Sequence, residues 1–155
     1  MLVTDRSALH HAGVTVGDME LSLRFYRDLL GLEVISDARL TEPFVFAIAG
    51  LQAEAIRIAN LGVPGSGQVL VELLEYQGVE RHPATARPCD PGSGHLCLEV
   101  ADIEAMCTRL ASAGVPMQSA RPVNIDISSV WGAKALYVSD PDGYFVEFHQ
   151  RPPAA

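Results

Sequence analysis

"GHLCLEVADIEAMCTRLASAGV", residues 94–115, has the pattern of a β-strand that runs into a capped helix. A similar stretch, "HHAGVTVGDMELSLRFYRDLLGL", stands at residues 10–32. In each stretch a histidine lies seven positions before the aspartate that is expected to cap the helix. The chain therefore contains an internal repeat, and the repeat includes a histidine.

Each stretch opens a module of one strand, one helix and three further strands. The first module is predicted over residues 8–76 and the second over residues 94–151, with a proline-containing linker at 77–93 between them. The later strands are expected at 32–40, 54–62 and 68–76 in the first module, and at 115–123, 133–140 and 144–150 in the second. The fold class is α+β, with two tandem βαβββ modules in a single domain over residues 1–155.

Composition limits the classes of function. With 155 residues and 48% hydrophobic side chains, the chain can bury a sizeable core. The net charge of −8 argues against nucleic acid or an anionic membrane as the main partner. No apolar run is long enough to span a bilayer, and the N-terminal residues lack the apolar segment of a secretory signal. We therefore expect a cytoplasmic protein that acts on a small molecule.

The three cysteines, Cys89, Cys97 and Cys107, have no metal-like spacing. We expect reduced thiols rather than disulfides. Cys97 and Cys107 fall in a predicted strand and a predicted helix, where packing in the core is the expected role.

A glutamate occupies the last strand of each module. Glu72 follows Gly67 by five residues and Glu147 follows Gly143 by four, and each glutamate is flanked by apolar residues. A carboxylate in such surroundings costs several kcal/mol unless it is paired or binds a cation.

The repeat predicts one metal site built from both modules. If the modules pack about a pseudo-twofold axis, His11 and Glu72 of the first would meet His95 and Glu147 of the second. Two imidazoles and two carboxylates suit one divalent ion such as Zn, Ni, Fe, Mn or Co, with positions left for substrate or water. The spacing to the capping aspartate favours His11 over its neighbour His10 as the ligand.

His82 and His149 have no counterpart in the other module, so we do not expect them to bind the metal. His149 shares a strand face with Glu147, where it could line the pocket.

The two repeated stretches, together with "LVELLEY" and "ALYVSDPDGYFVEF", resemble the vicinal oxygen chelate superfamily, the family of glyoxalases, bleomycin-resistance proteins and dioxygenases. The resemblance covers nearly the whole chain. It implies a half-open mixed β-barrel around a divalent ion, and it places the ligands on His11, Glu72, His95 and Glu147. It also implies a homodimer.

The four-residue ligand set resembles glyoxalase I-like and methylmalonyl-CoA epimerase-like members most closely. Extradiol dioxygenases and fosfomycin-resistance enzymes use two His and one Glu, and bleomycin-binding proteins generally lack the metal residues. The implied activity is that of a metal-dependent lyase, isomerase or epimerase acting on a small α-oxygenated carbonyl compound or thioester. An Fe(II) or Mn(II) ring-cleaving dioxygenase and a non-catalytic protein that binds a drug or metabolite remain the alternatives.

The common chemistry of these members is proton transfer next to a carbonyl, through an enediolate that the metal stabilises. We expect Glu147 to be the base, with Glu72 as the second choice. Arg57 is a candidate partner for an anionic group of the substrate. The other candidate pocket residues are Phe44, Phe46, Tyr76, Asn124, Trp131 and Tyr144.

Overall fold

The structure is a computed structural model that describes residues 9–83, 85–127 and 131–152. The chain divides into two compact units, residues 1–82 and 83–155, and each unit is described by itself. The boundary lies inside the segment predicted as a linker. Among the described residues, no helix has the length and apolar character needed to cross a membrane.

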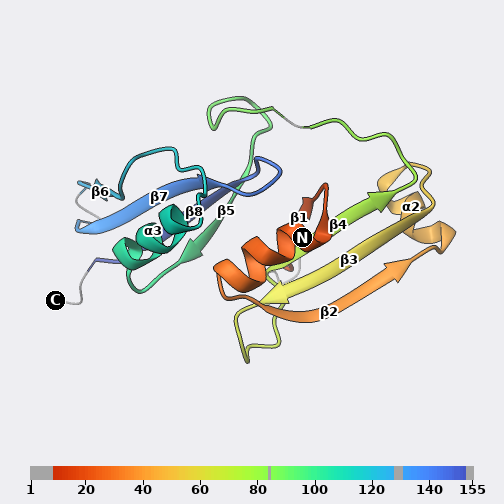
Figure 1. The fold of residues 1–155 in the computed structure, drawn as a ribbon, viewed down its shortest axis with the longest axis horizontal. Helices are drawn as coiled ribbons and strands as arrows, with labels where there is room; N and C mark the ends of the chain where they lie inside the picture. The colour runs from red at the N-terminus through yellow and green to blue at the C-terminus, as the bar shows by residue number, and fades with distance from the viewer. Residues whose placement is uncertain (1–8, 84, 128–130, 153–155) are drawn as a thin grey trace, which may run out of the picture. The chain divides into compact units, whose positions relative to one another are not determined.

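The first unit is a four-stranded mixed sheet with helices (Figure 1). Its elements in chain order are β1 (Ala12–Thr15), α1 (Met19–Leu23), the π-helical turn η1 (Arg24–Leu29) that continues α1, β2 (Glu33–Leu40), α2 (Pro43–Ala49), β3 (Ala55–Gly62) and β4 (Val71–Gln77). The strand order is β1-β4-β3-β2, with β1 parallel to β4 and the other pairs antiparallel.

The second unit repeats this topology. Its elements are β5 (His95–Glu99), α3 (Ile103–Ser112), β6 (Val123–Ile125), β7 (Ala133–Ser139) and β8 (Phe145–Gln150). The strand order is β5-β8-β7-β6, so in both units the first strand of the module lies beside the fourth, followed by the third and the second. Only the first and fourth strands are parallel, as in the first unit. The prediction of two tandem βαβββ modules is confirmed.

Strand register makes the two units equivalent residue by residue. Glu72 lies opposite Gly13 on the parallel strand and opposite Asn60 on the antiparallel strand. Glu147 lies opposite Cys97 and Tyr137 in the same way. Gly13 therefore corresponds to Cys97, and Asn60 corresponds to Tyr137.

Both predicted helix caps are confirmed. The Asp18 Oδ1 atom accepts a hydrogen bond from the Leu21 amide at 2.9 Å. The Asp102 Oδ1 atom accepts from the amides of Glu104 at 3.1 Å and Ala105 at 3.0 Å. Each cap satisfies amide groups that the first turn of a helix leaves without a backbone partner.

The core of each unit lies between the sheet and its helix. Side chains alternate between the two faces of a strand, so the neighbours of Glu72 and Glu147 point away from them. Those neighbours, Val71 and Leu73 on β4 and Val146 and Phe148 on β8, are at most 1% exposed. Each glutamate is thereby left on the opposite face of its sheet, away from α1 or α3.

One ion pair links helix and sheet at the same place in both units. Glu20, in the first turn of α1, lies 2.7 Å from Nη1 of Arg57 on β3. Glu104, in the first turn of α3, lies 2.7 Å from Nζ of Lys134 on β7. The ion pair ties the start of each helix to the third strand of its module.

Two local predictions were incomplete. The helix α2 stands between β2 and β3, where no helix was predicted; Pro43 begins it, and Gly50 ends it in the left-handed conformation at φ 65°. Residues 115–123 do not form one strand. Pro116 and Pro122 lack the amide hydrogen that a sheet needs, so only an isolated bridge at Met117 and the short β6 remain.

Candidate metal-binding site

The first unit brings His11 and Glu72 together. His11 immediately precedes β1, Glu72 lies on β4, and the parallel pairing of these strands sets the two side chains side by side. The distance from His11 Nε2 to Glu72 Oε1 is 3.5 Å. The side chains are 33% and 22% exposed, so both are open to a ligand.

The second unit brings His95 and Glu147 together at the equivalent place. The distance from His95 Nε2 to Glu147 Oε2 is 3.0 Å, with side chains 43% and 17% exposed. The Tyr137 hydroxyl lies 3.1 Å from the same His95 nitrogen. Each module therefore forms the His–Glu pair that the repeat predicted.

Both pairs fit two neighbouring ligands of one divalent ion. Imidazole nitrogens and carboxylate oxygens bind such ions at about 2.1 Å, which places two adjacent ligand atoms about 3 Å apart. The pairs are 3.5 Å and 3.0 Å apart, and each offers a nitrogen and an oxygen donor. Within either unit, the described residues contain no group of three or more His, Cys, Asp or Glu side chains that could hold a metal. Each unit thus offers two such donor side chains, one imidazole and one carboxylate.

The surroundings of the two glutamates differ. In the second unit, partial burial and the Glu147 carboxylate raise the pKa of the Cys97 thiol to about 11. Burial and the same carboxylate also raise the pKa of the Tyr137 phenol. In the first unit, Gly13 stands at the position equivalent to Cys97 and has no side chain. Asn60 stands at the position equivalent to Tyr137, and its side-chain amide donates to Ser36 Oγ at 2.9 Å. The Glu147 carboxylate therefore lies beside the hydroxyl of Tyr137 and the thiol of Cys97, whereas the Glu72 carboxylate has neither group at the equivalent positions.

Sequence reasoning missed Tyr137 and assigned Cys97 to the core. Cys97 is exposed and shares a face with His95, two residues before it. Because residues two apart on a strand point to the same face, the position of His95 already predicts that Cys97 lies on the ligand face and not in the core. The three cysteines are free thiols, as predicted.

The remaining histidines lie as follows. The Nδ1 atoms of His10 and His11 are 2.7 Å apart. His82 is exposed, with Nε2 3.7 Å from Glu80. His149 is half-buried on β8, two residues after Glu147.

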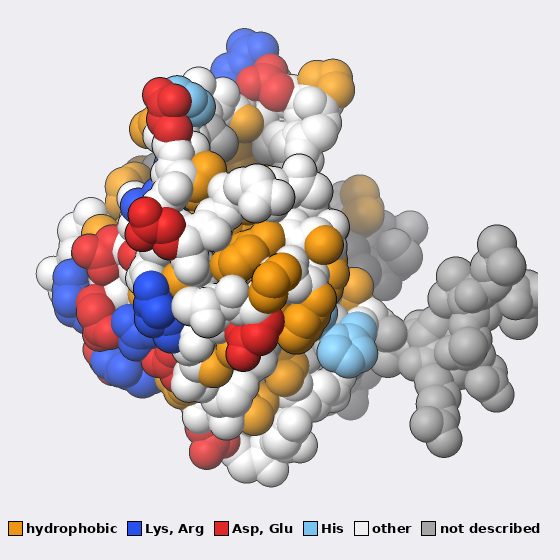
Figure 2. Space-filling model, turned by 90° about the vertical axis from the view of Figure 1, so that its right-hand side faces the viewer, with side chains coloured by type: hydrophobic (Ala, Val, Ile, Leu, Met, Phe, Trp, Pro, Cys, Tyr) orange, Lys and Arg blue, Asp and Glu red, His pale blue; other side chains and the backbone are white. Residues whose placement is uncertain are grey.

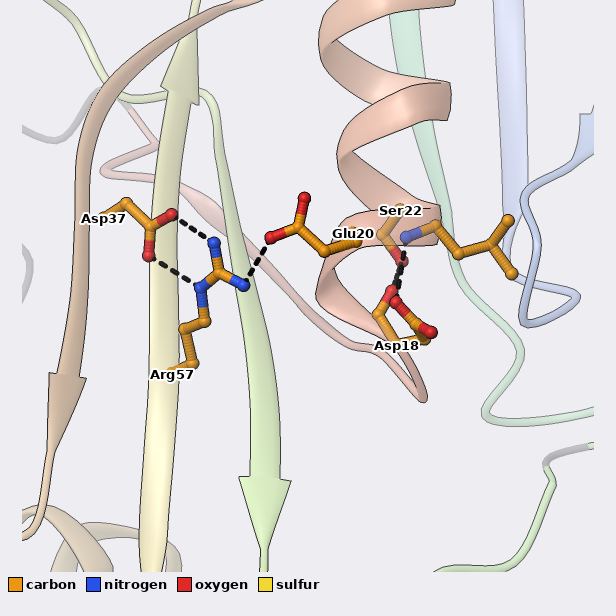
Figure 3. Close-up of polar contacts among 6 residues, drawn as sticks. Asp18, Glu20, Ser22, Asp37 and Arg57 are labelled. Atoms are coloured by element: carbon orange, nitrogen blue, oxygen red, sulfur yellow. Dashed lines mark hydrogen bonds and ion pairs between the residues drawn. The ribbon is translucent and has the colours of Figure 1, made fainter.

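Arg57 does not lie on the Glu72 face of its sheet. Arg57 lies opposite Glu75 in the sheet, and Glu75 is three residues after Glu72 on β4. Because side chains alternate between the two faces along a strand, Glu75 and Arg57 point to the other face, the one covered by the helix. Its guanidinium donates to both carboxylate oxygens of Asp37, at 2.9 and 2.6 Å, and to Glu20 at 2.7 Å (Figure 3). The prediction that Arg57 meets an anionic group of the substrate is therefore corrected: two carboxylates of its own unit already bind it.

The other candidate pocket residues are dispersed. Phe46 of α2 and Tyr76 of β4 belong to one apolar cluster between this helix and the sheet. Phe44 and Trp131 are 66% and 68% exposed, Asn124 is exposed on β6, and Tyr144 is half-buried after the turn that precedes β8.

Curated relatives are similar to this chain in sequence, and solved structures are similar to it in fold. Lactoylglutathione lyase of Haemophilus influenzae is 30% identical over 89% of this chain and 88% of its own length. A 2-epi-5-epi-valiolone epimerase from an Actinomyces species is 27% identical over 96% and 81% of the two chains. A glyoxalase family protein from Bacillus cereus superposes with a TM-score of 0.79 over 98% of this chain and 99% of its own, at 17% identity. Leishmania major glyoxalase I superposes with a TM-score of 0.62 over 92% and 86%, at 24% identity.

The family model of the Glyoxalase/Bleomycin resistance protein/Dioxygenase superfamily matches residues 8–148. The match contains both repeated stretches and both His–Glu pairs. The chain belongs to this superfamily.

Proposed function

We propose that this protein is a metal-dependent enzyme of the glyoxalase type, a lyase, isomerase or epimerase. Its substrate would be a small α-oxygenated carbonyl compound or thioester. The observation that carries the proposal is the duplicated His–Glu contact, 3.5 Å in one module and 3.0 Å in the other, at one strand register. Relatives named as a lyase and as an epimerase, both near 30% identity, support this class of reaction.

The proposed ligands of a single ion are His11, Glu72, His95 and Glu147. The proposal requires the two pairs to face each other, either within one chain or across a homodimer. Zn, Ni, Fe, Mn and Co suit this mixture of imidazole and carboxylate donors. When bound, the ion would polarise the substrate carbonyl and lower the energy of the enediolate.

Glu147 is the proposed base. Its side chain is 17% exposed against 22% for Glu72, and Cys97 and Tyr137 lie beside it. A carboxylate that is shielded from bulk water can take a proton from the carbon next to the carbonyl and return it to the same substrate. Glu72, beside Gly13 and Asn60, lacks those neighbours and would act mainly as a ligand.

The test is proton exchange in heavy water. The purified protein, made without a metal-binding tag, is stripped of metal and reloaded in turn with each of the five ions. It is then incubated with a panel of 2-hydroxycarbonyl compounds, thioesters and thiol–aldehyde adducts, and deuterium beside the carbonyl is followed by NMR. We expect exchange or turnover only in the metal-loaded protein.

Two other outcomes would contradict the proposal. Oxygen uptake with a catechol by the Fe(II) or Mn(II) form would identify a ring-cleaving dioxygenase. Tight binding of a small molecule that needs no metal, without exchange or turnover, would identify a binding protein of the same fold.

A further inference from the structure

The Glu72 face of the first sheet has a distinct chemical character. By strand register it carries these residues: Gly13 and Thr15 from β1, Glu72, Leu74 and Tyr76 from β4, Ile56, Ile58, Asn60 and Gly62 from β3, and Glu33, Ser36, Ala38 and Leu40 from β2. Within these four strands, all of which the structure describes, the face carries two carboxylates, Glu72 and, before the bulge of β2, Glu33, which accepts a hydrogen bond from the Gly65 amide. The same strands place no lysine or arginine on it.

The arginines of these strands lie on the other face. Arg39 and Arg57 are opposite each other in the register, on the side covered by the helix. Arg57 is held by Asp37 and Glu20, and the Arg39 Nε donates to Gln77 at 3.0 Å. An anionic group lying on the Glu72 face would meet the carboxylates of Glu72 and Glu33 and no lysine or arginine of these strands, which is unfavourable.

Beyond Glu72 the face becomes apolar. Ile58, Leu74 and Tyr76 are half-buried, so part of each side chain remains available for contact. They pack against Val45, Phe46 and Ile56, a cluster that α2 closes. Hydrophobic side chains gather on the side of the molecule where α2 lies (Figure 2).

The strip has a limited length. Side chains on one strand face recur about every 7 Å, so Tyr76 lies about 14 Å along the strand from Glu72. Leu74 and Ile58 are the apolar residues nearest to Glu72 in the register, and the part of each that is not buried forms the apolar area beside it. This area suits a branched aliphatic group or a single aromatic ring.

We infer that the substrate presents an uncharged, apolar substituent of this size to the Glu72 face. The inference rests on the proposed function, because it assumes that His11 and Glu72 bind the ion that holds the substrate oxygens. It assigns the substrate to the α-oxygenated carbonyl compounds with a hydrophobic side chain. Glutathione, with two free carboxylates, does not suit this face.

The experiment compares three hydroxamates, each of which binds a metal through two neighbouring oxygens. They carry a phenyl ring (benzohydroxamate), a methyl group (acetohydroxamate) or a carboxylate (succinic monohydroxamate). Binding to the metal-loaded protein is measured by calorimetry, so no turnover is needed. We expect benzohydroxamate to bind at least about tenfold more tightly than the other two, because its ring buries apolar surface.

Substitutions at Leu74 and Ile58, with a control at Val63, test whether the Glu72 face causes the preference for the phenyl ring. Leu74→Lys should remove the preference for the phenyl ring and improve binding of the carboxylate probe, because it adds a cation to the face. Leu74→Ala and Ile58→Ala, which are milder, should each reduce the preference about threefold or more. Val63→Lys makes the same chemical change just after β3, at a side chain 51% exposed, and should leave all three affinities unchanged.

The results distinguish a failure of this inference from a failure of the proposed function. Equal affinities in the metal-loaded wild-type protein, or tightest binding of the carboxylate probe, would overturn this inference and leave the proposed function standing. A preference that survives in all three face variants, or that Val63→Lys also removes, would equally overturn it. A protein that retains no metal and binds no hydroxamate would overturn the proposed function and the inference together.

Discussion

The two modules are nearly the same on their helix sides and differ on their ligand sides. Both helices begin at an aspartate cap, and both are tied to the third strand by an ion pair of 2.7 Å. The His–Glu pair is also repeated. The difference lies around each glutamate, where Gly13 and Asn60 stand in one module and Cys97 and Tyr137 in the other.

The comparison shows which features of the modules are shared and which differ. Repeated topology, caps and ion pairs place a histidine and a glutamate at the same point of each sheet. The residues beside that point then give the two halves different surroundings: a small, apolar face closed by α2 in the first module, and a hydroxyl and a thiol in the second.

The largest expected effect distinguishes the two glutamates. Glu147→Gln should lower the rate of deuterium exchange in the metal-loaded enzyme by about 10²- to 10⁴-fold, the usual contribution of a general base. Glu72→Gln, which keeps an oxygen donor, should lower the rate less. The comparison requires metal content to be measured in both variants. Equal losses, or a larger loss in Glu72→Gln at equal metal content, would reverse the assignment of the base.

Thiol reactivity tests the surroundings of Glu147. The pKa of Cys97 is raised to about 11 from an ordinary value of 9.0, first by burial and then by the Glu147 charge. Since only the thiolate reacts, Cys97 should be alkylated by iodoacetamide more slowly than Cys89 in the metal-free protein at pH 7.5, although both side chains are exposed. Peptide mass spectrometry over time gives both rates in one sample. Glu147→Gln should speed the reaction of Cys97 only partly; equal rates for Cys97 and Cys89 in the wild-type protein would disprove the shielding.

The helix–strand ion pairs should differ in strength. Arg57 bridges two carboxylates and its side chain is 26% exposed, so Arg57→Met should lower the free energy of unfolding by about 1 to 2 kcal/mol. Lys134 has one carboxylate partner, which is 59% exposed, so Lys134→Met should cost less than about 1 kcal/mol. Urea denaturation measures both. A larger loss in Lys134→Met would contradict the comparison.

The Arg57 bridge also predicts a pH dependence. Arg57 lowers the pKa of Asp37 from its ordinary value of 3.8, so the contribution to stability is present above that value and is lost as the pH falls through the lower, folded pKa. Wild-type protein should therefore lose stability below about pH 4 more steeply than Arg57→Met. Parallel curves for the two proteins would show that Asp37 is not coupled to Arg57.

The smallest expected difference concerns the caps. Asp18→Ala and Asp102→Ala should each lower the free energy of unfolding by about 1 kcal/mol. Asp102 accepts two amide hydrogen bonds and Asp18 accepts one from the amides of its first turn, so Asp102→Ala should have the larger effect. The Asn variants, which keep an acceptor oxygen, are the controls. An equal loss in Ala and Asn variants would exclude the cap as its cause.

Much of this arrangement was predictable because it depends on local patterns. The caps, the repeat and the apolar alternation around Glu72 and Glu147 each depend on a short stretch of sequence, and the order of strands and helices in each module could be predicted from them. The helix α2 was missed because its run of apolar residues has no polar face to show a helical period. Arg57 was misplaced because its partners, Glu20 and Asp37, lie 37 and 20 residues away in the chain. Tyr137 was missed because its contact with His95 depends on the register between distant strands.

We propose that the two His–Glu pairs together complete a single metal site. Elemental mass spectrometry of untagged wild-type protein, of the His11→Ala/Glu72→Ala variant and of the His95→Ala/Glu147→Ala variant tests it most directly. We expect about one divalent ion per complete set of four ligands in the wild-type protein and loss of the ion in both variants. Retention of that ion by either variant, or no metal in wild-type protein after reconstitution with Zn, Ni, Fe, Mn and Co, would contradict it.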